Sequence, residues 1–295
     1  MGLQRPPTVT GRYSPLRYPG GKGKLAKFVR ALVKENRLCD GRYVEPFAGG
    51  AAIAWELLLT GVVRRVSIND YDNSVYSFWA SVLDNTDKIC ELIHNSPLTV
   101  EFWDKQKTVL KNKNSESALD IGFAFFYLNR TNRSGIINGG LIGGRNQSGL
   151  WKMDARFNKP LLIEKIQKIA ERKSHIQLTN LDAIEFMKQN FSSWDKNTLI
   201  YLDPPYFEKG KFLYYNSFKT EDHEALAASI ENYDEKNWIV SYDSAPEIRS
   251  LYRKHKEIRY LLNYSARNAT RGHEVMYFSK SLRVPAFAPP MMAID

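Results

Sequence analysis

The sequence predicts an α/β fold with a Rossmann-like, largely parallel sheet, and two stretches carry that prediction. Residues 199–202 are four apolar residues, and they are followed by Asp203-Pro204-Pro205-Tyr206. An apolar run of this length is typical of a buried parallel strand, and proline ends it because proline cannot donate a hydrogen bond to the neighbouring strand. Residues 43–70 have the pattern of strand, small-residue turn, helix, strand and acid, which is typical of a nucleoside-binding half-sheet. Ligands of open α/β sheets bind at the carboxyl ends of the strands, so both stretches predict a site at one edge.

Composition limits the class of protein. The chain has 295 residues, of which 43% are hydrophobic and 25% charged, enough for one large α/β domain with an insertion. The net charge of +10 favours a polyanionic partner such as nucleic acid, although charge can also serve solubility alone. Cys39 and Cys90 form no close pair, so we expect a reducing compartment, the cytoplasm, and no metal. No membrane-spanning run is visible, and we expect a monomer.

The first third combines a glycine-rich loop with the half-sheet. Tyr18-Pro19-Gly20-Gly21-Lys22 allows close backbone approach to a ligand, but it lacks phosphate-loop spacing and could be a basic surface loop. Residues 24–37 predict an amphipathic helix. Asp70 lies twenty residues beyond Gly50, where an acid can bind a ribose diol. No pyrophosphate site is visible, so a nucleoside cofactor fits better than a dinucleotide. In the alternative, the glycines serve packing and Asp70 caps a helix.

The middle of the chain predicts helices over residues 72–128, followed by a loop of more than thirty residues. A structureless loop of that length in a compact domain is generally functional or disordered. Its arginine and amide side chains are the types that contact base edges in a bidentate way. The alternative is a flexible glycine loop. We expect nucleic-acid contacts from Asn129, Arg130, Asn132, Arg133, Arg145 and Asn146.

The last third completes the predicted sheet. Residues 163–170 predict a helix, 176–180 a strand, and Asp182 caps the next helix. Residues 238–241 predict a core strand, and 257–262 with 275–278 a terminal antiparallel pair. Arg267 and Arg271 lie between the members of that pair, where they could meet phosphates.

The turn after residue 202 offers a carboxylate from Asp203, a fixed Pro204 carbonyl and the ring of Tyr206. Two acceptors and an aromatic face suit a planar ring with an exocyclic amino group. A strand-ending turn with a surface acid is the alternative.

These motifs, in this order, resemble the Dam-type (class alpha) family of DNA adenine-N6 methyltransferases over about residues 14–280. The family's Phe-x-Gly-x-Gly is Phe47-Ala48-Gly49-Gly50-Ala51 here, and Arg133 replaces its usual aromatic residue. The resemblance implies an S-adenosyl-L-methionine-dependent enzyme that flips adenine out of double-stranded DNA. Its catalytic domain would span 12–95 and 161–280, its target-recognition insertion 96–160, and its tail 281–295.

The resemblance also implies roles for individual residues. The catalytic turn would be Asp203, Pro204, Pro205 and Tyr206, and the cofactor contacts would be Tyr18, Lys22, Glu45, Phe47, Gly49, Asp70, Asp182 and Asp203. The same turn would also suit an RNA adenine or a DNA cytosine-N4 methyltransferase. A non-catalytic DNA-binding module with this fold is the alternative of another class.

Overall fold

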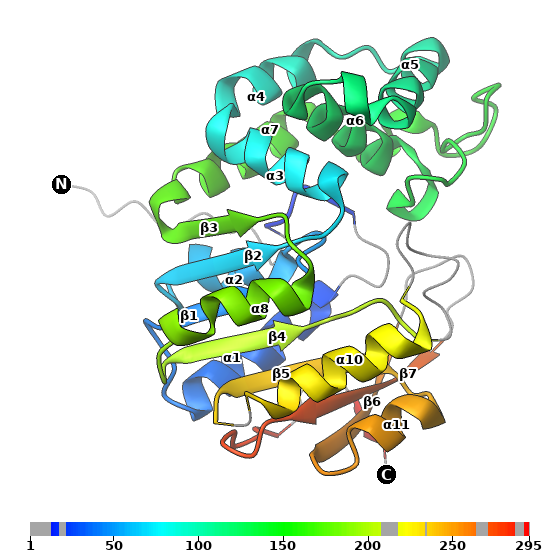
Figure 1. Cartoon of the computed structure of the whole chain (residues 1–295). Helices are drawn as coiled ribbons and strands as arrows, with labels where there is room; N and C mark the ends of the chain where they lie inside the picture. Colours follow the sequence, from blue (N-terminus) through cyan, green and yellow to red (C-terminus); the bar gives the residue numbers. More distant parts are fainter. Residues whose placement is uncertain are drawn as a thin grey trace.

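The computed structural model describes residues 13–17, 22–207, 218–233, 235–263, 271–286 and 292–294. Its centre is an eight-stranded sheet in the order β3-β2-β1-β4-β5-β7-β6-β8 (Figure 1). Five strands are parallel, and β7, β6 and β8 join them antiparallel. The strands are β1 Arg42–Glu45, β2 Arg65–Asn69, β3 Ile176–Thr179, β4 Thr198–Leu202, β5 Asn237–Asp243, β6 Lys256–Asn263, β7 Arg271–Phe278 and β8 Met292–Ile294.

This order creates a switch point between β1 and β4. The chain runs outward from β1 to β2 and β3, then returns to place β4 on the other side of β1. In open sheets of this kind the loops at the carboxyl ends of the two strands at the switch point diverge, and ligands bind between them. The predicted strands and the terminal antiparallel pair are confirmed. Part of the segment predicted as a tail also contributes to the sheet, because β8 pairs with β6.

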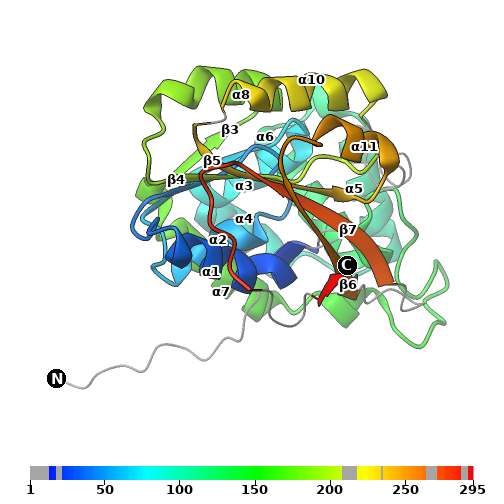
Figure 2. The same ribbon diagram turned by 90° about the horizontal axis from the view of Figure 1, so that it is seen from below.

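Helices cover both faces of the sheet. Figure 2 shows α8 and α10 on one face, and α1 and α2 on the other. In Figure 1 the helices α3 to α7 gather beyond β3. The helices are α1 Ala26–Glu35, α2 Ala52–Leu59, α3 Asn73–Asp84, α4 Thr86–Asn95, α5 Val100–Lys111, α6 Ala118–Thr131, α7 Lys159–Ala170, α8 Ala183–Asn190, α10 Thr220–Glu231 and α11 Pro246–Leu251.

Strand β4 shows why the sheet has two buried faces. Leu199 and Tyr201 belong to the hydrophobic cluster beneath α1 and α2, whereas Ile200 and Leu202 belong to the cluster beneath α8, α10 and α11. Alternate side chains point to opposite faces, so a strand covered on both sides is apolar throughout. This is the physical basis of the apolar run in the sequence.

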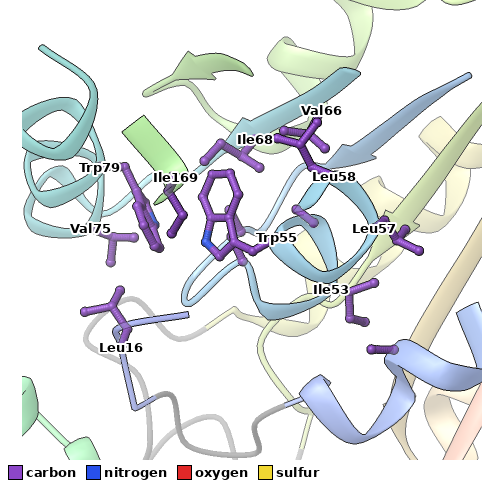
Figure 3. Close-up of a cluster of buried hydrophobic side chains, with 14 of the residues drawn as sticks. Leu16, Ile53, Trp55, Leu57, Leu58, Val66, Ile68, Val75, Trp79 and Ile169 are labelled. Atoms are coloured by element: carbon purple, nitrogen blue, oxygen red, sulfur yellow. The ribbon is translucent and has the colours of Figure 1, made fainter. Parts of the chain in front are cut away.

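The helices beyond β3 share the core of the sheet domain. Figure 3 shows Trp55 of α2 beside Trp79 of α3, with Ile169 of α7 nearby; the two indole centroids are 4.9 Å apart. Trp103 of α5 and Phe126 of α6 belong to the same buried cluster. The helical region is therefore packed against the sheet through continuous apolar contacts. Within the described ranges, no helix has the length and apolarity needed to cross a membrane.

Candidate active site

Asp203 lies directly after β4, where two neighbouring elements hold its carboxylate. Lys22, at the start of a short 3-10 helix (Lys22–Leu25), places its Nζ 3.2 Å from Asp203 Oδ1. Ser241 of β5 donates a hydrogen bond to the same oxygen at 2.8 Å. Tyr201 Oη lies 2.8 Å from Ser241 Oγ, which positions that hydroxyl. Lys22 and Ser241 thus fix the position of Asp203 Oδ1 before any substrate binds, so the alternative of a free surface acid is wrong.

Glu274 of β7 is a central residue of the site that the sequence did not reveal. Its Oε2 lies 2.9 Å from Lys22 Nζ and accepts a hydrogen bond from Tyr260 at 2.8 Å. Its Oε1 accepts a hydrogen bond from the Tyr206 hydroxyl at 2.7 Å. The side chain is only 2% exposed. A signal was available, because an acid directly precedes the buried apolar run 275–278.

Lys22 serves as the shared cation of these two carboxylates. Burial alone would lower the pKa of Lys22, but the charges of Asp203 and Glu274 outweigh it and raise that pKa well above its usual value. Burial raises the pKa of Asp203; Lys22 opposes this shift and Glu274 adds to it. The ammonium therefore remains charged over the whole neutral range. The Tyr206 ring is buried, with its centroid 5.0 Å from Lys22 Nζ.

Asp70 closes the glycine turn between β1 and α2. Its Oδ2 accepts a hydrogen bond from Gly49 N at 2.7 Å, and its Oδ1 accepts one from Asp72 N at 2.9 Å. Burial raises the pKa of Asp70 to about 7, against the effect of these two bonds. The helix cap of α3 is Asp72, not Asp70, so the capping alternative is wrong. Ala51, which stands where the family has its second glycine, adopts a left-handed φ of 46°.

Glu45 ends β1 beside the same edge. It is buried and accepts a hydrogen bond from Tyr43 at 2.9 Å. Burial raises the pKa of Glu45 to about 8; the Tyr43 bond opposes the shift and the charge of Asp203 adds to it. Neither Glu45 nor Asp70 has an ion-pair partner within the described residues. The carboxyl ends of β1, β2 and β4 thus bring three acids to one edge, with Lys22 beside only one of them.

Two further predicted cofactor residues lie on the same edge. Asp182 caps α8 by accepting hydrogen bonds from Ile184 N and Glu185 N, and it is exposed. The ring of Phe47 contacts Phe218 with centroids 5.7 Å apart. Tyr18 lies outside the described residues.

Comparison with known proteins identifies the family. Residues 18–265 match the model of the D12 class N6 adenine-specific DNA methyltransferases. The chain belongs to that family. It is an adenine-specific DNA methyltransferase, as the order of its motifs indicated. A curated relative, the type II methyltransferase M.MjaIII of Methanocaldococcus jannaschii, is 24% identical over 245 residues, covering 75% of this chain and 80% of that protein.

Among solved structures, this methyltransferase aligns with two of the rRNA methyltransferase AviRa from Streptomyces viridochromogenes. One has a TM-score of 0.38 and 14% identity, and covers 90% of this chain and 88% of the other. The second has a TM-score of 0.34 and 10% identity, and covers 86% and 84%. The order of the strands in the sheet itself shows the α/β fold.

Two of the residues expected to contact DNA are structural. Asn129 accepts a hydrogen bond from Arg17 N and donates one to Arg17 O, both at 2.7 Å. Asn132 accepts a bond from Trp103 Nε1 at 2.7 Å and donates to the carbonyls of residues 136 and 137. Asn129 also donates a hydrogen bond to Gly135 O at 3.0 Å, and both amide side chains are buried. This corrects the prediction of base contacts for Asn129 and Asn132, because neither has a group left for DNA.

The other predicted DNA contacts occupy different environments. Arg145 forms a bidentate pair with Asp104 on the surface, at 2.9 and 2.7 Å. Arg133 and Asn146 are exposed. Arg130 is partly buried and donates hydrogen bonds to the backbone carbonyls of Pro15 and Arg156. Arg271 begins β7, but its side chain is outside the described part, as is the whole of Arg267.

Proposed function

We propose that this methyltransferase transfers a methyl group from S-adenosyl-L-methionine to N6 of adenine in double-stranded DNA, after flipping the base out of the helix. The observation that carries the proposal is Asp203, which Lys22 and Ser241 hold at the open end of β4. Its second oxygen and the Pro204 carbonyl remain as candidate acceptors for the two hydrogens of an exocyclic amine.

The donor set at the edge fits the cofactor. S-adenosyl-L-methionine carries a sulfonium and an ammonium. Glu45 is a buried acid and Asp70 a half-buried one, and neither has a cationic partner in the described part of the chain. Asp70 would bind the ribose, and Gly49 allows the backbone to approach it. We propose Tyr18, Lys22, Phe47, Asp182 and Asp203 as the remaining contacts. When bound, the cofactor supplies an electrophilic methyl group.

The protein's contribution to the reaction is orientation of the adenine. Asp203 and the Pro204 carbonyl would accept the two N6 hydrogens and thereby turn the nitrogen lone pair out of the ring plane. Extruding the base costs roughly a few kcal/mol, which pocket contacts offset. Tyr206 would stack on the ring; its hydroxyl is fixed by Glu274. Since that ring is buried, the base must displace what covers it. Positioning and electrostatics then lower the barrier without a covalent intermediate.

The test is incubation with S-adenosyl-L-methionine and unmethylated duplex DNA, followed by nucleoside mass spectrometry and methylation-sensitive sequencing. N6-methyladenine in a fixed sequence context is the expected product. N4-methylcytosine would retain the mechanism and change the base. Asp203→Ala should abolish transfer and leave DNA binding close to the wild-type level. Near-normal methylation by that variant would refute the role of Asp203.

We also propose DNA contacts from the exposed or partly exposed cations and from Asn146. Arg130 lies in the last turn of α6 and Arg133 comes two residues after the helix ends. Arg145 can exchange its surface pair with Asp104 for a phosphate or a base. Arg267 and Arg271 remain proposed phosphate contacts. Replacing Arg130 or Arg133 by glutamine should weaken DNA binding or relax sequence preference. Unchanged affinity and preference in both variants would exclude these two contacts.

A further inference from the structure

We propose that Leu150 and Trp151 form a base-contacting tip, in which Trp151 stacks on an exposed base of the bound DNA and Leu150 packs beside it. This inference rests on the proposed function, because it names a contact to the same DNA. It adds a specific site, since neither residue follows from the motifs of the family.

The tip is the most exposed apolar feature of the described chain. Leu150 is 92% exposed and the adjacent Trp151 is 68% exposed. The five other tryptophans are all buried: Trp55, Trp79, Trp103, Trp194 and Trp238. Single exposed apolar residues are ordinary, but two large neighbours projecting together indicate a binding surface.

The loop beneath the tip is built to hold it outward. The Gln147 amide donates hydrogen bonds to the carbonyls of Ile142 and Gly144 at 2.8 and 2.6 Å, and its oxygen accepts one from Met153 N at 3.0 Å. Leu141 and Met153 anchor the two ends in the core. The loop is therefore a closed, internally bonded unit and not a slack connection.

The backbone of this loop turns through three left-handed residues. Gly143, Gly144 and Gln147 have φ values of 84°, 74° and 48°. Glycine adopts this conformation without cost, so Gln147 is the residue of the three whose backbone is strained. The hydrogen bonds of the Gln147 side-chain amide thus stabilise a loop conformation in which Leu150 and Trp151 are exposed. Such an arrangement is expected where a partner covers the apolar residues.

The surroundings indicate that the partner is a polyanion. Arg17, Arg130 and Arg156 lie close together, and none of them has an ion-pair partner among the described residues. The buried Nε of Arg130 has no hydrogen-bond partner. Burial lowers the pKa of Arg130 to about 9, and the charges of Arg17 and Arg156 add to that shift. A phosphate would relieve this repulsion.

The position of the loop agrees with a DNA partner. Arg156 is five residues beyond Trp151 in the same segment, and its carbonyl accepts a hydrogen bond from Arg130, so the chain that carries the tip leads directly to this arginine cluster. Figure 1 shows the loop between α6 and α7 projecting on the side toward which β4 points, where Asp203 lies, and Figure 2 agrees. Phosphates and aromatic base faces occur together in nucleic acid, which therefore fits both parts of the surface.

The experiment uses Trp151 as its own probe. Unmethylated DNA fragments are added to the full-length protein, and tryptophan emission and acrylamide quenching are followed. Because the other tryptophans are buried, we expect DNA to shift the emission to shorter wavelength and to protect against quenching. The DNA-dependent change should be absent in Trp151→Phe. Trp151→Ala should weaken DNA binding about tenfold, as expected for loss of one stacked base.

Two controls separate stacking from general damage. Leu161→Ala removes an apolar side chain of α7 that is 40% exposed, and its DNA affinity should stay within about twofold of wild type. Melting temperatures of the Trp151 variants should equal that of the wild type, since the side chain is exposed.

The outcomes separate this inference from the proposed function. If the wild type methylates DNA but neither the emission nor the quenching of Trp151 changes when DNA is added, the proposed base contact of the tip is refuted and the proposed function stands. The same holds if Trp151→Ala binds DNA as the wild type does. An emission shift that follows protein concentration without DNA would assign the tip to self-association. If the wild type neither binds nor methylates DNA, both proposals fail.

Discussion

Replacement of Glu274 by glutamine tests the buried network most directly. The carboxylate accepts hydrogen bonds from Tyr206, Tyr260 and Lys22, whereas an amide has one accepting oxygen and one donating nitrogen. The nitrogen cannot face Lys22, which has donors only. It must therefore replace Oε1, and the Tyr206 hydroxyl must reverse to accept.

The size of the effect follows from the geometry. Removing one partner of a buried ion pair costs about 3–5 kcal/mol. Lys22 retains Asp203 as an ion-pair partner at 3.2 Å, so the cost should lie at the lower end of this range. The free energy of unfolding should fall by about 3 kcal/mol. Each 1.4 kcal/mol corresponds to about tenfold in rate. If the displaced Lys22 and Tyr206 transmit most of this loss to Asp203, the transfer rate should fall roughly 100-fold.

The pH dependence distinguishes positioning from simple destabilisation. The charge of Glu274 raises the pKa of both Lys22 and Asp203. Its removal should lower both values, so a limb of the pH–rate profile set by Asp203 moves to lower pH. Single-turnover methylation across a pH series measures this, and denaturant unfolding measures stability. Tyr260→Phe is the matched control, because it removes one bond to Glu274 and leaves every charge, with an expected cost of about 1 kcal/mol.

A Glu274→Gln variant with the wild-type rate and pH profile would refute the positioning role. A variant that is destabilised but has an unshifted profile would show that the network only stabilises the fold.

Three further predictions concern stability. Gly135→Ala places a Cβ 2.2 Å from a backbone carbonyl oxygen, whereas Gly144→Ala meets nothing within 4 Å at a similar φ; in denaturant unfolding the first should cost about 2 kcal/mol more. The pKa of Glu45 is raised to about 8 in the folded protein, so the unfolded chain loses this proton at lower pH than the folded chain does. The free energy of unfolding of the cofactor-free protein should therefore fall by a few kcal/mol between about pH 5 and pH 8. In melting experiments, Glu45→Gln should make stability less dependent on pH over this range. Asn129→Leu should lower the melting temperature and the methylation rate, whereas the exposed Asn146→Ala should leave the melting temperature unchanged.

The two ligand-facing turns were predictable because their signals are local. An apolar strand stopped by Pro204 and Pro205, and a small-residue turn followed by Asp70, each specify their geometry within a few residues. Sheet order brings these turns together, and the alternation of strands and helices was enough to place them on one edge. The parallel core and the terminal antiparallel pair followed from the same patterns.

Glu274 and Ser241 were missed for a different reason. Their contact with Lys22 and Asp203 depends on the pairing of β5 with β7, in which Ser241 lies opposite Met276. The register between two strands that are far apart in the sequence cannot be read from the spacing of residues along the chain. Composition also misplaced Asn129 and Asn132, since an amide that binds backbone and one that reads a base have the same chemistry. The apolar run before them indicated burial and should have weighed more.

The hydrogen bonds between Asn129 and the backbone of Arg17 have a consequence for sequence discrimination. They tie the end of α6 to a segment that reaches Lys22 five residues later, while Gly135 packs on the same Arg17 carbonyl. If α6 meets DNA as proposed, a DNA sequence that seats this helix poorly would also disturb Arg17, to which α6 is hydrogen-bonded. The expected outcome is that an incorrect site lowers the single-turnover methylation rate as well as the binding affinity.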